Sequence, residues 1–354
     1  MKTMKFGISL LVWALVAANA QSFTSGSTGS DGALQLVTPG TISFDPRAFD
    51  PPLNPSGDNV YQFTSIYIGK GVTVKLSTRS LTGPVFWLSQ GPVLIDGTID
   101  LNGGDGNARA PSLAGAGGYP GGPTQKSGYR PEGFTPNVFL VPLVGGFGGD
   151  GGQTQGGGGG GGALLIASST SITINGAVTA DGGGSADGIG GGGGAIRLVA
   201  PVIDGLEGAL SARGGQPAGA DGRIRFEAFD NRFIGSLNET PYAQGRPFGL
   251  FLPPDRPASV RVLSIGGMPV TSPELTINQP APLTIGLEAR FIPPGSVLDV
   301  ECFAKDGQSV TASATPLEGT FELSYARALI RFPSGSSHCQ VKGAWKQPRK
   351  SERR

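Results

Sequence analysis

The chain has 354 residues, of which 61 are glycine, and its 27 basic and 26 acidic side chains leave a formal net charge of +1 at pH 7. A chain so nearly neutral lacks the concentrated basic surface of nucleic-acid-binding proteins, so no nucleic-acid partner is expected. Two cysteines and one histidine are too few for a convincing zinc or haem site, and no cofactor is expected.

The N-terminus has the pattern of a secretory signal peptide. Two lysines precede an apolar run over residues 6–18, and a site of small residues ends at Ala20, before Gln21. The run is short for a membrane span, and no later segment approaches about 18 uninterrupted apolar residues. We expect cleavage between Ala20 and Gln21 and export to the periplasm, the cell surface or the extracellular space. The alternative is an uncleaved N-terminal anchor.

An internal repeat runs through residues 83–229, with a degenerate copy at 65–76. Each unit has a short apolar string, a second alternating string with a glycine near its centre, and then Gly-Gly. Ile172, Ile174 and Val178 alternate with polar residues, which is typical of a strand with one buried face. The central glycines are Gly97, Gly176 and Gly208, and the pairs are Gly103-Gly104, Gly182-Gly183 and Gly214-Gly215.

The repeat predicts an all-β fold whose first domain, residues 21–250, is a parallel β-helix (a solenoid) of stacked coils. We expect the Gly-Gly pairs to bend the chain at positive φ and the central glycines to permit a bend or close backbone approach. Long glycine runs such as 156–162 would be exposed connectors, extended or polyproline II-like. A bundle of polyproline II helices needs a strict glycine period of three and is not expected.

The segments ALLIASSTSITINGAVTADGGG (163–184) and AIRLVAPVIDG (195–205) resemble units of secreted glycine-rich bacterial proteins of the parallel β-helix, pectin-lyase-like type. The resemblance covers about residues 60–230. It implies this architecture and, more weakly, a surface location. It carries no activity to individual residues.

Residues 107–150 interrupt the repeat as a long insertion. Binding often resides in long loops on a rigid scaffold, and tyrosine and arginine carry much interface energy. We expect the insertion to be separable from the coils and to contact any partner, such as cell-surface glycans or matrix components. A disordered insert is the alternative. The candidate binding residues are Arg109, Tyr119, Lys126, Tyr129, Arg130 and Phe134.

Aspartates on the repeat are the candidates for catalysis if the protein is a polysaccharide lyase or glycoside hydrolase. Asp96 and Asp100 lie about 13 Å apart along one strand, which does not suit a carboxylate pair. Solvated polar residues of an outer face are the favoured interpretation. The aligned repeats predict three columns: Asp96, Asn175 and Glu207; Asp100, Thr179 and Ser211; Asn102, Asp181 and Arg213.

Residues 145–153 match the start of a calcium-binding nonapeptide repeat. Gly152 stands where an aliphatic residue belongs, however, and no second nonad follows in tandem. Calcium is therefore only a weak alternative to the absence of a cofactor.

After the proline-rich junction at 251–258, short strands with turn signals predict an antiparallel β-sandwich over residues 251–346. It resembles immunoglobulin-like modules in strand count, although Trp345 follows both cysteines. Cys302 and Cys339 are expected to form a disulfide in an exported chain. Residues 347–354 read as a disordered basic tail. The expected strands are Val260–Ile265, Leu275–Ile277, Leu283–Ala289, Val297–Phe303, Val310–Ala314, Thr320–Tyr325, Ala328–Phe332 and Cys339–Trp345.

Together these features favour a secreted or surface-exposed structural or adhesive protein without catalytic activity. The alternative is a carbohydrate-active β-helix enzyme, for which Asp96, Asp100 and Asp181 are the candidate residues.

Overall fold

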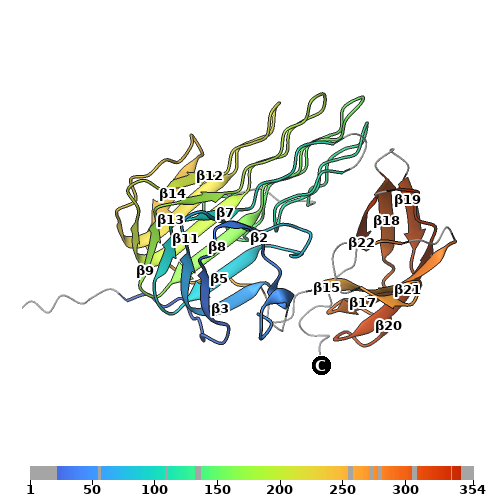
Figure 1. Ribbon diagram of the computed structural model, residues 1–354, viewed down its shortest axis with the longest axis horizontal. Coiled ribbons are helices and arrows are strands. Elements are labelled where there is room, and N and C mark those ends of the chain that lie inside the picture. Colours follow the sequence, from blue (N-terminus) through green and yellow to red (C-terminus); the bar gives the residue numbers. More distant parts are fainter. Residues whose placement is uncertain are drawn as a thin grey trace, which may run out of the picture.

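The computed structural model describes residues 22–54, 57–107, 111–131, 137–253, 258–270, 275–277, 281–304, 309–335 and 337–343. Ala20, Gln21, Arg109, Phe134 and the basic tail lie outside these ranges. The expectation of an all-β chain is confirmed, since one short 3-10 helix, η1 (Pro46–Ala48), is the single helical element of the described residues. Parallel strands fill the N-terminal part, and antiparallel strands fill the C-terminal part (Figure 1).

Two parallel sheets form the N-terminal part. The larger has the strand order β14-β13-β11-β8-β5-β3-β6-β9, and β1 also pairs with β3. Because β11 pairs with both β8 and β9, the path returns on itself. Its strands are β1 (Gly32–Leu36), β3 (Val60–Ile68), β5 (Val85–Ser89), β6 (Val93–Ile95), β8 (Ala163–Ser168), β9 (Ser171–Ile174), β11 (Ala195–Asp204), β13 (Arg223–Asn231) and β14 (Tyr242–Gly245).

The second parallel sheet has the order β12-β10-β7-β4-β2. Its strands are β2 (Gly40–Ser43), β4 (Val72–Lys75), β7 (Thr98–Asp100), β10 (Ala177–Thr179) and β12 (Ala209–Ser211). Strands from successive repeats therefore pair in both sheets.

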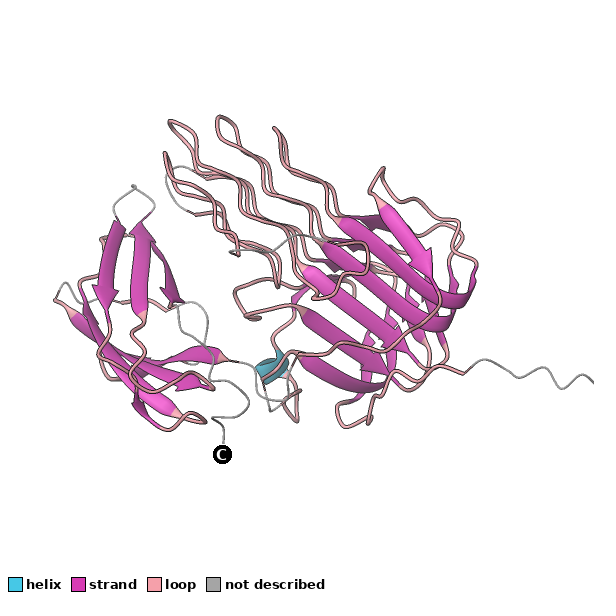
Figure 2. Ribbon diagram, turned by 180° about the vertical axis from the view of Figure 1, so that it is seen from behind, coloured by secondary structure: helices cyan, strands magenta, loops and turns pink. Residues whose placement is uncertain are grey.

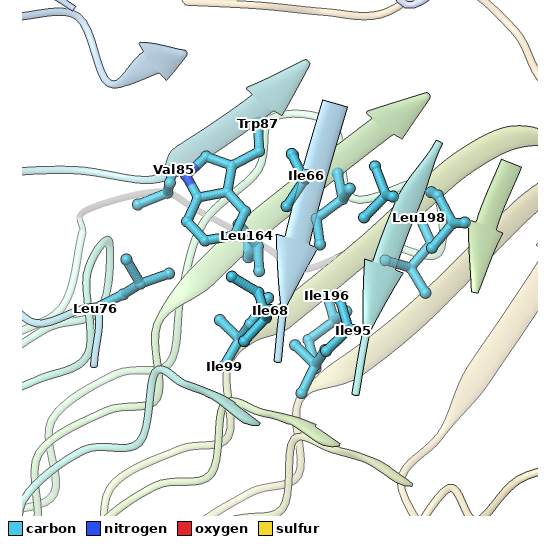
Figure 3. Packing of buried hydrophobic residues seen from close by; sticks show 14 of the residues in the cluster. Ile66, Ile68, Leu76, Val85, Trp87, Ile95, Ile99, Leu164, Ile196 and Leu198 are labelled. Carbon is cyan, nitrogen blue, oxygen red and sulfur yellow. The ribbon is translucent and has the colours of Figure 1, made fainter. Parts of the chain in front are cut away.

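The period-two pattern of the repeats places aliphatic side chains in one stacked core. Ile68 lies opposite Ile95, and Ile95 lies opposite Ile174, in the register of β3, β6 and β9. All three side chains are fully buried, and Figure 3 shows Ile68 and Ile95 among the packed residues of this core. Burying each contributes about 1.5–3 kcal/mol relative to leaving it exposed. The predicted buried face is confirmed.

Three strands depart from the one-face pattern. Every residue of β5 and β8, and the first six of β11, is buried, so these strands are covered on both faces. A second core on their outer side includes Leu140 and Leu143 of the insertion, with Leu250 packed against it. Continuous apolar sequence rather than alternation is the signature of such strands.

Between the strands, the glycine-rich segments form an ordered array instead of exposed connectors. Residues 156–162 are buried, and their backbone N–H groups donate to three neighbouring segments in rotation. Gly157 and Gly160 donate to segment 117–122, Gly158 and Gly161 to segment 189–194, and Gly159 and Gly162 to segment 101–106. Three further segments donate to carbonyl oxygens of the same run: 111–117, 145–152 and 180–185.

A three-residue rotation of hydrogen bonds is the geometry of polyproline II chains, which turn once in three residues and have no internal hydrogen bonds. The expectation that such a bundle is absent is therefore wrong. Residues 145–153 carry the period, reading Gly-Gly-x three times with Phe147, Asp150 and Gln153 at the third position. The array extends beyond the strands as a set of hairpins, seen as loops in Figure 2.

Close packing explains most glycines of the array, although Gly117 also has positive φ. None of the Gly-Gly pairs at 103–104, 182–183 and 214–215 has positive φ, so the expectation of left-handed corners is wrong. A Cβ atom on Gly161 would lie closer than 3.0 Å to the backbone of Ala180, a separation that real Cβ atoms essentially never show. The same holds for Gly97, Gly176 and Gly208, where the predicted close approach is confirmed.

The C-terminal part has two antiparallel sheets that share one buried core. Cys302 of β18 lies opposite Cys339 of β22, and the two form the expected disulfide. Residues 275–277 form no strand, and the two strands expected over 320–332 are replaced by one, β21. The strands are β15 (Ser259–Ile265), β16 (Met268–Pro269), β17 (Leu283–Arg290), β20 (Glu318–Gly319) and β21 (Ser324–Ile330), with β18 (Asp299–Ala304), β19 (Ser309–Ser313) and β22 (Ser337–Lys342) in the second sheet.

Candidate functional site

The described candidates of the insertion occupy different surroundings. Tyr119 is half-buried in the glycine array, where its ring lies 6.1 Å from that of Phe147 and its N–H donates to Gly146. Burial raises the pKa of the Tyr119 hydroxyl. Lys126 is exposed, and Arg130, also exposed, lies 3.4 Å from the carboxylate of Asp150.

Tyr129 faces the C-terminal part. Its hydroxyl donates to Oε2 of Glu301 on β18 at 3.3 Å, and the same oxygen accepts from Gln340 at 3.0 Å and from Lys342 at 2.9 Å. Burial, followed by the charge of Glu301, raises the pKa of the Tyr129 hydroxyl. This side chain thus contacts another part of its own chain.

Backbone hydrogen bonds join the insertion to the glycine run 156–162. The N–H of Gly115 donates to Gly160, and the N–H groups of Gly146 and Gly149 donate to Gly161 and Gly158. Residues 111–122 and 145–152 therefore supply neighbours of the central glycine run. These hydrogen bonds argue against the expectation that residues 107–150 can be removed without disturbing the repeat, because the described backbone of the segment forms part of the array.

The predicted polar columns follow the strand register. Asp100 lies opposite Thr179, which lies opposite Ser211, as the aligned repeats predict. Ser211 is only 2% exposed, however, and is not a solvated outer residue. Its hydroxyl donates to Oδ1 of Asp181 at 2.5 Å, and the N–H of Arg213 donates to the same oxygen at 2.6 Å.

The other two candidate aspartates are also engaged with neighbouring backbone or side chains. Asp96 accepts a hydrogen bond from the side-chain amide of Asn175 at 2.8 Å. Asp100 accepts from the N–H of Asn102 at 2.8 Å and lies 3.5 Å from the ammonium of Lys75. Contacts from Asn175 to Asp96 and from Arg213 to Asp181 link one repeat to the next.

A buried charge network on the outer face of β11 and β13 was not predicted from the sequence. Arg197 donates from Nε and Nη2 to the two carboxylate oxygens of Glu227, each at 3.0 Å, and Arg225 donates from Nε to Oε1 at 2.6 Å. The side chains of Arg197 and Glu227 are 1% and 0% exposed. Charged residues within the apolar strings IRL and IRFE are the sequence signal that could have revealed it.

Phenylalanine rings cover this network. The Arg197 guanidinium lies 4.7 Å from the centre of the Phe248 ring, and that of Arg225 lies 5.0 Å from the centre of the Phe139 ring. Arg225 also donates to the carbonyl of Val138 at 3.2 Å. The network therefore holds residues 138–139 of the insertion, and Phe248 just before the junction, against the parallel sheet.

No group of three or more His, Cys, Asp or Glu side chains that could hold a metal ion occurs among the described residues. In the segment that matches a calcium nonapeptide, Asp150 accepts from the N–H of Gly128 at 2.7 Å and pairs with Arg130. That carboxylate closes a turn of the insertion. Within the described ranges, no helix is long and apolar enough to cross a membrane.

Comparison with family models, with curated protein sequences and with solved structures yields no match to this chain.

Proposed function

We propose that the protein is an exported structural or adhesive protein without catalytic activity, and that its partners are cell-surface glycans or matrix components. In this proposal the parallel sheets and glycine array form a β-helical solenoid of pectin-lyase-like type. The C-terminal sheets form an immunoglobulin-like module. Pairing of strands from successive repeats supports the first assignment, and the antiparallel core of β17, β18 and β21 supports the second.

This proposal rests on the candidate carboxylates, which form hydrogen bonds between or within repeats. Asp96, Asp100 and Asp181 each accept hydrogen bonds from neighbouring residues, and Asp181 belongs to a later repeat than the other two. A glycosidase needs two carboxyl groups across one scissile bond, about 5–10 Å apart, with one free to give or take a proton. Carboxylates that accept hydrogen bonds from neighbouring residues suit a structural role better than a catalytic one.

Two features support export. The chain begins with a signal-like segment, outside the described residues, and the Cys302–Cys339 disulfide fits an oxidising compartment. We propose cleavage before Gln21 and no requirement for calcium or another cofactor.

The alternative function is that of a polysaccharide lyase or glycoside hydrolase. The test is incubation of the full exported chain with a panel of soluble polysaccharides, with and without calcium, with product release and binding both measured. Binding without product release is the expected result. Product release that Asp96→Ala, Asp100→Ala or Asp181→Ala abolishes, in a variant of unchanged thermal stability, would establish the enzyme instead.

A further inference from the structure

An open hollow of about 360 Å3 lies at the free ends of the glycine-rich hairpins. Its lining comes from four hairpins that are apart in sequence, through Asp105, Gln155, Ser185 and Gln216 among others. The hairpin ends extend away from the strands of both sheets (Figure 1). The volume is at the small end of the range of about 300–1,000 Å3 for ligand pockets.

Hydrogen bonds hold the frame of the hollow. The N–H of Gly106 donates to the carbonyl of Gly184 at 2.6 Å, and the N–H of Ser185 donates to the carbonyl of Gln216 at 2.9 Å. Asp105 accepts from the N–H of Gly184 at 2.7 Å through Oδ1. The Ser185 hydroxyl also donates to the carbonyl of Gly156 at 2.9 Å, so all four hairpins are fixed to one another before any ligand arrives, which lowers the entropic cost of binding.

The polar groups on this frame have unused hydrogen-bonding capacity. Within the part of the chain that the structure describes, the side-chain amides of Gln155 and Gln216 have no intramolecular hydrogen bond, and Asp105 uses only Oδ1. Each glutamine amide offers two donors and an acceptor, and the carboxylate offers further acceptor positions. Groups that both donate and accept would satisfy this set.

The charge around the hollow is negative. Asp105 lines it, and Asp187 lies beside it, accepting from the N–H of Gln155 at 3.0 Å. Among the lining residues that the structure describes, which exclude 108–110, there is no lysine or arginine. A carboxylate or sulfate on a ligand would meet like charge, whereas neutral hydroxyl groups would not.

From this combination we propose that the hollow binds one or two neutral sugar units of a polysaccharide through their hydroxyl groups. The proposal rests on the adhesive function above and names its ligand class. Its site differs from the insertion residues that the sequence suggested, since Gln155 and Gln216 lie outside residues 107–150.

The test measures binding of four probes by isothermal titration calorimetry and NMR: cellotetraose, maltotetraose, mannotetraose and tetragalacturonate. The full chain is expected to bind at least one neutral tetrasaccharide, and to bind it more tightly than tetragalacturonate. Gln155→Ala and Gln216→Ala each remove unused amides and should weaken binding about three- to tenfold, the effect of one lost hydrogen bond. Asp105→Asn keeps the Oδ1 acceptor for Gly184 and replaces the second acceptor with a donor, so it should weaken binding similarly.

Gln153→Ala is the matched control. Gln153 lies two residues from Gln155, but its Oε1 accepts from Gln125 at 2.9 Å and it does not line the hollow. The control variant should bind as the unmodified chain does. Thermal unfolding and circular dichroism establish that each variant keeps its fold.

Three outcomes would overturn this site: no binding of any neutral probe at about 10 mM, tighter binding of tetragalacturonate, or equal losses in Gln153→Ala and Gln216→Ala. Failure of the proposed function has a different readout. Cleavage of a bound tetrasaccharide would refute the non-catalytic role while leaving the site intact. Polysaccharide binding that survives all three hollow variants would remove the site and keep the adhesive role.

Discussion

The backbone N–H of Gly161 donates to the carbonyl oxygen of Gly192 at 2.9 Å, and three residues earlier Gly158 donates to Ile189 at 3.0 Å. The two segments therefore run parallel and meet once per turn of three residues. At this spacing backbone packs directly against backbone. Hydrogen bonds between glycine-rich segments, which carry almost no side chains, stabilise the array.

A methyl group added within the glycine run 156–162 should strongly destabilise the fold. Gly161→Ala would place its Cβ against the backbone of Ala180, where no flexible side chain can move aside. Overpacking of this kind costs about 1–3 kcal/mol, or more where backbone must shift. The measurement is the midpoint of urea unfolding. Gly249→Ala is the control, since a Cβ there meets nothing within 4 Å. Equal midpoints for both variants would contradict the packing described here.

Loss of the carboxylate in the buried charge network should also be costly. Glu227→Gln keeps the side-chain shape but leaves the guanidinium groups of Arg197 and Arg225 buried without a counter-charge. Removing one partner of a buried pair costs about 3–5 kcal/mol. Asp230→Asn is the control, because Asp230 accepts from Arg232 at 2.7 Å at an exposed site, where a pair contributes about 0–1 kcal/mol. Urea unfolding measures both, and a loss under 1 kcal/mol for Glu227→Gln is the contrary result.

Reduction of the disulfide should weaken the C-terminal sheets alone. The bond closes a loop with a sequence separation of 37 residues, for which the loop-entropy model gives about 3–4 kcal/mol. Cys302→Ser with Cys339→Ser should therefore speed hydrogen exchange in β18 and β22, as measured by mass spectrometry of peptides. Peptides from β8 serve as the internal control and should exchange unchanged. Faster exchange in β8 as well would mean that the two parts unfold as one unit.

The carboxyl of Asp187 should titrate below its ordinary value of 3.8. The Thr154 hydroxyl, which donates at 2.7 Å, is the largest cause of the lowered pKa, followed by the Thr154 N–H. Because the folded pKa is lower than the unfolded one, the stabilisation is present above about pH 4 and is lost as the pH falls through the folded value.

NMR titration of the Asp187 side chain checks this prediction. Thr154→Val removes the hydroxyl donor and should raise the pKa of Asp187 towards 3.8. Thr320→Val, in the C-terminal part, should leave it unchanged. A titration midpoint at or above 3.8 in the unmodified chain would argue against the hydrogen bonds at this hairpin end.

The sequence predicts the strands better than it predicts what joins them. Ile172 and Ile174 alternate with polar residues, and that local signal suffices to place β9 against the core. The all-glycine run 156–162 gives no such signal, because its reason lies in neighbours contributed by segments elsewhere in the chain. Only residues 145–153, at the side of the array, show the three-residue period in their own sequence.

The candidate sites likewise combine features that local sequence indicates with features that depend on distant segments. Arg197 and Glu227 stand out as charges inside apolar strands, but the sequence does not tell which loop covers them. Asp105, Gln155 and Gln216 are unremarkable polar residues in turn-rich sequence. They form a hollow only because hydrogen bonds set four distant hairpins side by side, and that pairing depends on the register of the whole array.

The composition of the glycine run 156–162 affects the resistance of the protein to proteases. Proteases recognise an extended stretch of substrate by inserting its side chains into pockets and by pairing with its free backbone groups. Residues 156–162 present no side chain, and their backbone groups are already hydrogen-bonded to neighbouring segments. Cleavage in the N-terminal part is therefore expected at the hairpin ends, where lysine and arginine side chains such as Lys126 and Arg130 are exposed, while the interior of the array stays whole.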